Sequence, residues 1–131
     1  MKQPIRIALL CLVAVAGLSV AISKNFGQQI VTVPGVYENF TVGKDSGDLE
    51  GMRVVIVPAG GGHYAIVQIA QGGAEDPKPE FVPAEVKGKS VSFAVGDEKF
   101  TGTATATGLT LKNAAGEAQT LKRKACTAYF K

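Results

Sequence analysis

The chain has little of what catalytic and metal-binding sites are usually built from. It contains one histidine, His63, and two cysteines in 131 residues. A single imidazole cannot form a histidine-based metal site, because such a site needs several ligands around one ion. The carboxylates are scattered, mostly in expected turns, and no spacing among them selects a pair for general acid and base chemistry. We therefore expect no cofactor and no enzymatic activity, with a hydrolase as the least favoured alternative.

Cysteine is too scarce to supply a covalent framework. Cys11 lies in an apolar run near the N-terminus, and Cys126 stands alone near the C-terminus. If the first is removed during export, no internal disulfide can form and the fold depends on its hydrophobic core. Cys126 is then a candidate reactive thiol or a link between two copies, or simply a small apolar side chain.

An excess of positive charge is also lacking once the N-terminus is set aside. The whole chain has 14 basic and 11 acidic residues, and Lys2 and Arg6 precede the apolar run, which leaves 12 against 11 beyond it. A nucleic-acid-binding protein would concentrate basic residues on one face. The charge pattern therefore excludes nucleic acid as the expected partner.

Residues 1–23 have the layout of a secretory signal, with two cationic residues, an apolar run over 7–22 and small residues near its end. Cleavage after Ala21 or Ser23 would leave one domain, residues 24–131, in an exported protein that is periplasmic or secreted. The alternative is an uncleaved anchor, although this run of 16 residues is shorter than the roughly 17–25 that span a bilayer. Only that alternative places the protein at a membrane.

The rest of the chain predicts an all-β domain. Short apolar or alternating runs recur between turn residues, and no segment has the helical period that a parallel sheet's crossover needs. We expect an antiparallel meander of about eight short strands that forms a small barrel or sandwich. The candidate strands are residues 30–33 continuing weakly through 36–42, then 49–57, 63–70, 80–86, 90–95, 100–107, 109–112 and 119–124.

Alternation along these runs predicts which faces are buried. Residues 100–107 place four threonines on one face, which suits a solvated surface, and an unusually small inner row opposite them: Phe100, Gly102, Ala104 and Ala106. The small row indicates either a closely packed second layer or room for a small ligand. Arg123 shares a face with Leu121, so we expect it to point inward and pair with a carboxylate.

Two expected strands, residues 52–57 and 64–70, are apolar on both faces. Strands of this kind are usually covered on both sides. Their outer face is the best indication in the sequence of a surface for a protein partner or a second copy. The alternative is that they lie at a closed corner of a small barrel.

The segment Gly60-Gly61-Gly62-His63-Tyr64 joins these two strands. Phosphate-binding glycine loops precede a helix, whereas a strand follows here, so a flexible hairpin turn accounts for the glycines. We take Gly61, Gly62, His63 and Tyr64 as the candidate partner contact.

A resemblance extends over most of the region beyond residue 23. Gly47-Asp48-Leu49-Glu50-Gly51-Met52, Gly62-His63-Tyr64-Ala65-Ile66-Val67-Gln68 and the closing Leu121-Lys122-Arg123-Lys124 resemble small exported bacterial proteins of uncharacterised function. A looser resemblance is to periplasmic lysozyme inhibitors, small secreted β-barrels whose Ser-Gly-x-x-Tyr loop enters the enzyme's cleft. The segment 60–64 keeps the glycine and tyrosine, but Gly60 replaces the serine that would reach the catalytic carboxylate.

These observations favour an exported, non-enzymatic binding or interaction module that uses the barrel rim or the doubly apolar strands. The second hypothesis is an inhibitor or modulator of a cell-envelope enzyme, which would contact it through the loop over residues 58–64.

Overall fold

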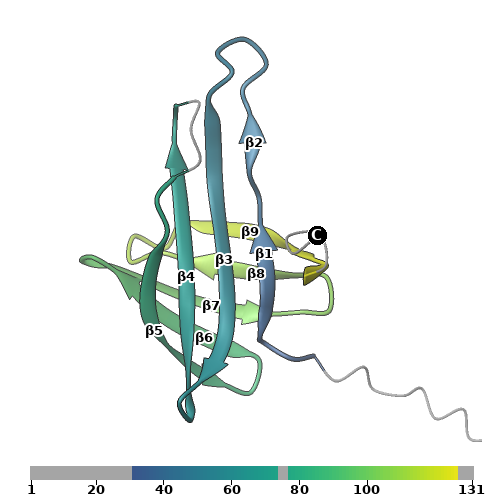
Figure 1. The fold of residues 1–131 in the computed structure, drawn as a ribbon, viewed down its shortest axis with the longest axis vertical. Coiled ribbons are helices and arrows are strands. Elements are labelled where there is room, and N and C mark those ends of the chain that lie inside the picture. Colours follow the sequence, from purple (N-terminus) through teal and green to yellow (C-terminus); the bar gives the residue numbers. More distant parts are fainter. Residues whose placement is uncertain (1–30, 74–76, 127–131) are drawn as a thin grey trace, which may run out of the picture.

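The structure is a computed structural model that describes residues 31–73 and 77–126. The expected signal segment, residues 1–23, lies outside these ranges. The described residues form an all-β, antiparallel structure (Figure 1). Its strands are β1 (Gly35–Glu38), β2 (Thr41–Val42), β3 (Leu49–Ala59), β4 (Gly62–Gln71), β5 (Glu80–Lys87), β6 (Ser90–Val95), β7 (Glu98–Ala104), β8 (Gly108–Lys112) and β9 (Ala118–Lys124).

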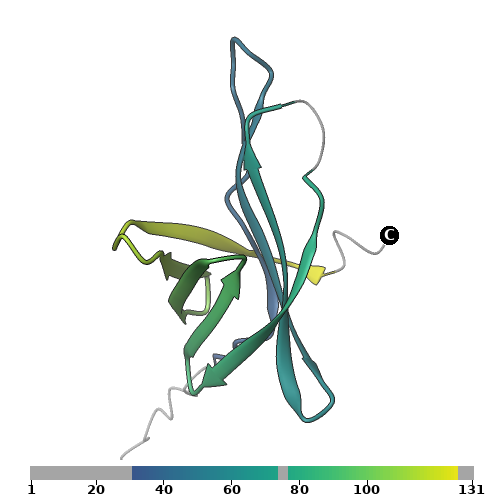
Figure 2. The same ribbon diagram turned by 90° about the vertical axis from the view of Figure 1, so that its left-hand side faces the viewer.

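The strands form a closed barrel. From β3 to β9 each strand pairs with the next, and β1 closes the sheet because it pairs with both β9 and β3. Eight strands therefore make the barrel, and β2 is an extra strand that extends along β3. The upright strands β3 and β4 cross β7, β8 and β9 and reach beyond them (Figures 1 and 2). The prediction of an antiparallel meander is confirmed, and of the two architectures expected it is the barrel.

The core forms where the inward rows of crossing strands meet. Alternate residues of each strand point inward, and the largest fully buried ones include Tyr37, Ile56, Leu109, Leu111 and Leu121.

None of the described residues belongs to a helix long and apolar enough to cross a membrane.

Two expected strands end differently in the structure. Residues 31–34 are not a strand, although Val33 is buried in the core. The strand expected over 100–107 ends at Ala104, because Thr105 forms a turn in which its Oγ1 accepts a hydrogen bond from the Gly108 N–H at 3.1 Å. Threonine hydroxyls compete with ladder bonds in this way. The expected row of four outer threonines is therefore reduced to Thr101 and Thr103 on β7.

The small inner row on β7 is closely packed. A Cβ added at Gly102 would lie 2.6 Å from the Leu111 Cδ2 and 2.6 Å from the Thr110 carbonyl oxygen. Ala104 is 1% exposed. Ala106 lies in the turn after β7 and is exposed, so the prediction that it belongs to this inner row is wrong. Of the two interpretations of this row, close packing is therefore the correct one, and it leaves no room for a ligand beneath Gly102.

One end of the barrel is plugged by Arg123, which points inward as expected. Its guanidinium donates to the carbonyl oxygens of Thr32 and Pro34 and to the Tyr37 hydroxyl, the last at 2.6 Å, and it lies over the Tyr37 ring at 4.8 Å. The Tyr37 hydroxyl in turn donates to the Val33 carbonyl at 2.6 Å. Carbonyls and a hydroxyl, rather than the expected carboxylate, thus accept the Arg123 hydrogen bonds in the described part of the chain.

The opposite end of the barrel is open. Met52, Ile69 and Phe100 are the last apolar side chains of their inward rows there, and a hollow of about 280 Å³ lies above them. Polar residues continue the inward rows around its rim: Gln71, Glu98, Asn113, Glu117 and Gln119. We call this hollow the mouth.

Candidate functional site

The outer face of β3, β4 and β5 carries an apolar surface. The register pairs Val55 with Ile66, Val57 with Tyr64, Ile66 with Phe81, and Tyr64 with Pro83. We call these six residues the apolar face. The four residues on β3 and β4 are half-buried, and Phe81 and Pro83 on β5 are exposed. The prediction that residues 52–57 and 64–70 are apolar on both sides is confirmed, since the alternate residues Val54, Ile56, Ala65 and Val67 are buried in the core.

An aromatic pair lies on the apolar face. The rings of Tyr64 and Phe81 are stacked, with centroids 4.9 Å apart and an angle of 10° between their planes. Phe81 is 62% exposed, which leaves most of the outer ring accessible. Aromatic side chains of this kind are enriched among the residues that contribute most to protein–protein binding.

Phe81 was not singled out by the sequence interpretation, although a signal for it existed. In residues 80–86, Val82, Ala84 and Val86 share the inward face, so alternation places Phe81 on the outer face. A phenylalanine on the outer face of an otherwise polar or small row is unusual. This feature of the sequence was enough to identify Phe81 as a candidate contact residue.

A polar network borders the apolar face on the side towards the mouth. On the same outer rows of β3 and β4, the Arg53 Nε donates to Glu38 at 2.9 Å and its Nη1 donates to Gln68 at 3.0 Å. Lys124 adds a second ion pair to Glu38 at 3.2 Å. An apolar centre next to ordered polar groups is the usual anatomy of an interaction surface.

The candidate contact residues Gly61, Gly62, His63 and Tyr64 lie in the β3–β4 turn and the first residues of β4. Gly60 and Gly61 have φ of +58° and +80° and join Ala59 to Gly62, which is the two-residue turn that favours glycine at both positions. Tyr64 belongs to the apolar face, whereas His63 is the neighbouring residue of the strand and so points to the other side. His63 and Tyr64 are both half-buried, on opposite faces of β4 just beyond the hairpin tip.

Cys126 lies just beyond β9 and its thiol is exposed and free. Its exposure is consistent with either a reactive thiol or a link between copies. Among the described residues no group of three or more histidines, cysteines or carboxylates could hold a metal ion.

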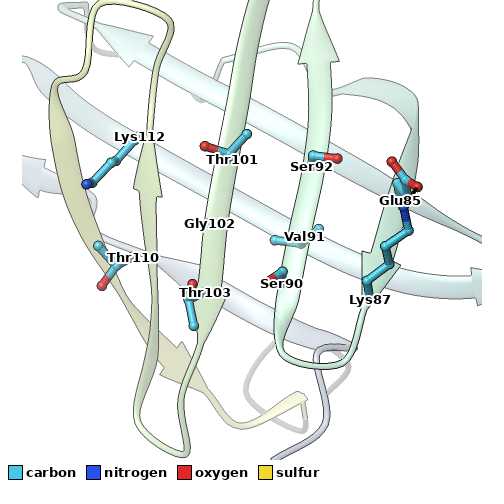
Figure 3. Close-up of a pocket in the computed structure, with 10 residues that line it drawn as sticks. All are labelled: Glu85, Lys87, Ser90, Val91, Ser92, Thr101, Gly102, Thr103, Thr110 and Lys112. Carbon is cyan, nitrogen blue, oxygen red and sulfur yellow. Dashed lines mark ion pairs between the residues drawn. The ribbon is translucent and has the colours of Figure 1, made fainter.

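A second hollow of about 460 Å³ lies on the outer face of β5–β8 (Figure 3). Its floor carries serine and threonine hydroxyls, and Lys112 and the Glu85–Lys87 ion pair, 2.7 Å long, stand at opposite sides. The Lys87 hydrogen bond and charge lower the pKa of Glu85, and the same contact raises the pKa of Lys87. Both groups are fully exposed, so this surface has the character of a solvated sheet face.

Comparisons of the chain with protein-family models, with curated proteins and with solved structures found no match.

Proposed function

We propose that the chain is an exported, non-enzymatic binding module that contacts a protein partner through the apolar face. The observation that carries this proposal is the exposed Phe81 ring stacked on Tyr64. Removing an exposed phenylalanine from water contributes roughly 1.5–3 kcal/mol to association. A partner that covers the stack would bury both rings together.

Rigidity supports the same proposal. Tyr64 lies on a strand paired on both sides, with β3 and with β5, and the stack restricts both rings before a partner arrives. Contacts on such a rigid element lose little conformational entropy on binding. The charged residues around Arg53 lie beside the rings rather than beneath them, so they can form the rim of the interface without being fully desolvated.

The test is native mass spectrometry of the protein purified from its own compartment without denaturation. We expect a retained protein partner with the wild-type chain and its loss in Phe81→Ser. Val42→Ser is the matched control, because Val42 is a second apolar side chain of nearly equal exposure, 63% against 62%, at a distant position on β2. A partner retained equally by both variants, or absent from the wild type, would overturn the proposal.

A second candidate function is inhibition of a cell-envelope enzyme, favoured by the hairpin tip. A Cβ built at Gly60 or Gly61 would lie more than 4 Å from every atom except those of its chain neighbours. The hairpin tip is therefore free to enter a cleft. The resemblance to periplasmic lysozyme inhibitors adds Tyr64 as the anchoring side chain. A lysozyme activity assay with the purified protein tests this, and we expect 1:1 inhibition that Tyr64→Ala weakens. Unchanged lysis at saturating protein would contradict it.

A further inference from the structure

The mouth has a small apolar floor, in which Ile69 is half-buried and the other apolar side chains are almost fully buried. Met52 and Phe100 are 2% and 3% exposed, yet both line the hollow of about 280 Å³, together with Ile69. Small-molecule sites are usually concave, with apolar walls and a few fixed polar groups. The volume of about 280 Å³ lies just below the roughly 300–1,000 Å³ that is usual for ligand pockets, so the mouth suits a ligand of fragment size.

A chain of side-chain hydrogen bonds fixes the wall beside Met52. The Met52 N–H donates to the Asn39 Oδ1 at 2.7 Å, and the Asn39 Nδ2 donates to the Gln119 Oε1 at 3.2 Å. The Gln119 Nε2 then donates to the Met52 Sδ at 3.7 Å. This closed chain holds the thioether and the amide in one arrangement without a ligand.

The glycine at position 51 keeps this chain together. Its φ is +110°, and an added Cβ would lie 2.8 Å from the Asn39 carbonyl oxygen and 2.8 Å from its Oδ1. Only glycine lets β3 approach Asn39 closely enough for Met52 to donate to it. The wall of the mouth is thus built into the backbone at the break between β1 and β2.

The charge at the mouth is negative. Two carboxylates, Glu98 and Glu117, line it, and the described lining residues include no lysine or arginine. The Asn113 Nδ2 donates to one oxygen of Glu117 at 2.8 Å. Within residues 31–73 and 77–126 the other oxygen of Glu117 has no hydrogen-bond donor, and Glu98 has neither a donor nor an ion pair.

We propose that the mouth binds a small organic ammonium ion, with its apolar part on Met52 and Phe100 and its charged nitrogen between Glu98 and Glu117. Carboxylates with unused lone pairs attract a cation and repel an anion. The apolar floor requires a hydrophobic body, which separates this ligand class from metal ions and from simple ammonium. The site is independent of the apolar face, because Ile69 and Tyr64 lie towards opposite ends of β4.

Three probes of similar shape test the proposal: 2-phenylethylammonium, 2-phenylethanol and 3-phenylpropionate. Each is titrated into the exported chain while NMR records the Met52 methyl, one of two methionine methyls in the sequence. We expect a saturable shift with the ammonium probe and no binding of 3-phenylpropionate. The alcohol should bind more weakly than the ammonium probe, by about two- to fivefold for each carboxylate that pairs with the ammonium group.

Glu98→Gln and Glu117→Gln should each weaken the ammonium probe by about two- to fivefold and leave the alcohol unchanged. Glutamine at 117 retains an oxygen that can accept the Asn113 hydrogen bond, so the turn is preserved. Glu85→Gln removes an equal charge from the other face and should have no effect. The proposal would be overturned if the three probes bound equally or if the NMR signal of the Met52 methyl did not shift. Equal effects of the three substitutions would also overturn it.

Discussion

The Tyr37–Arg123 plug gives a prediction whose magnitude can be worked from the structure. Tyr37 is completely buried, and its hydroxyl both donates to the Val33 carbonyl and accepts from Arg123, each at 2.6 Å. Tyr37→Phe keeps the ring and creates no large cavity. It leaves the Val33 carbonyl without the Tyr37 donor and removes the closest hydroxyl acceptor of the Arg123 guanidinium, at the plugged end.

Each unsatisfied buried polar group costs about 1–3 kcal/mol. Arg123 keeps its hydrogen bonds to the carbonyls of Thr32, Pro34 and Thr105, so we take the lower part of that range for the Val33 carbonyl and for the guanidinium. The expected loss in free energy of unfolding is then about 2–3 kcal/mol, which lowers the Tm of a domain of this size by about 8–20 °C. Urea unfolding followed by circular dichroism, together with a thermal scan, measures both quantities.

Tyr64→Phe is the matched control. The Tyr64 ring is half-buried on the apolar face, and among the described residues its hydroxyl makes no hydrogen bond. We expect its free energy of unfolding to stay within about 0.5 kcal/mol of the wild type. If Tyr37→Phe were destabilised no more than Tyr64→Phe, the plug would not contribute to stability and the reasoning would be refuted.

A double-mutant cycle adds a second readout. Arg123→Met removes the other partner, and the coupling between the two substitutions measures the Tyr37–Arg123 interaction itself. Because the guanidinium both donates to the hydroxyl and lies over the ring, we expect a coupling of about 1 kcal/mol or more.

Three further predictions concern other features. Gly102→Ala should lower the free energy of unfolding by about 1–3 kcal/mol because its Cβ meets Leu111 and a backbone oxygen. Gly62→Ala has no positive φ and its Cβ would meet only the Ala59 carbonyl oxygen at 4.0 Å, so it should change the free energy of unfolding by less than about 0.5 kcal/mol. Equal effects of the two substitutions in urea titrations would contradict the packing argument. Burial raises the pKa of Tyr37 above its ordinary value of 10.0 despite the opposing charge and hydrogen bond of Arg123. The protonated Tyr37 hydroxyl therefore contributes fully to the free energy of unfolding below pH 10, and this contribution is lost as the pH rises through the pKa of the folded state. Above pH 10 the free energy of unfolding should fall less steeply with pH in Tyr37→Phe than in the wild type. The exposed Cys126 thiol should react with a maleimide in the folded protein nearly as fast as in urea, and a rate more than about tenfold slower would show that it is covered.

Local chemistry made most of the fold predictable from the sequence. Turn residues separate the strands, and alternation predicted that Arg123 points inward on the same face as Leu121, as the structure confirms. The errors arose where side chains override strand propensity, as when the Thr105 hydroxyl ends β7. The length of β1 was also wrong, because Asn39 takes over one of the hydrogen bonds that a continuous ladder would make.

The sites were less predictable because they join residues far apart in the chain. The doubly apolar runs indicated the apolar face correctly, but placing Phe81 on Tyr64 requires the β4–β5 register. The mouth brings Gln119 to Met52 across 67 positions, which no local pattern records. Tyr64 was selected for its place beside a glycine run, whereas its position in the structure follows from its face of β4.

The plug also sets a direction for the molecule. Arg123 holds the Thr32 carbonyl at the closed end, so the chain joins the barrel at the end opposite the mouth. Tyr64 lies near the hairpin end of β4 and Ile69 near its other end, so the Tyr64–Phe81 stack is on the half of the barrel nearer this entry and the mouth faces away from it.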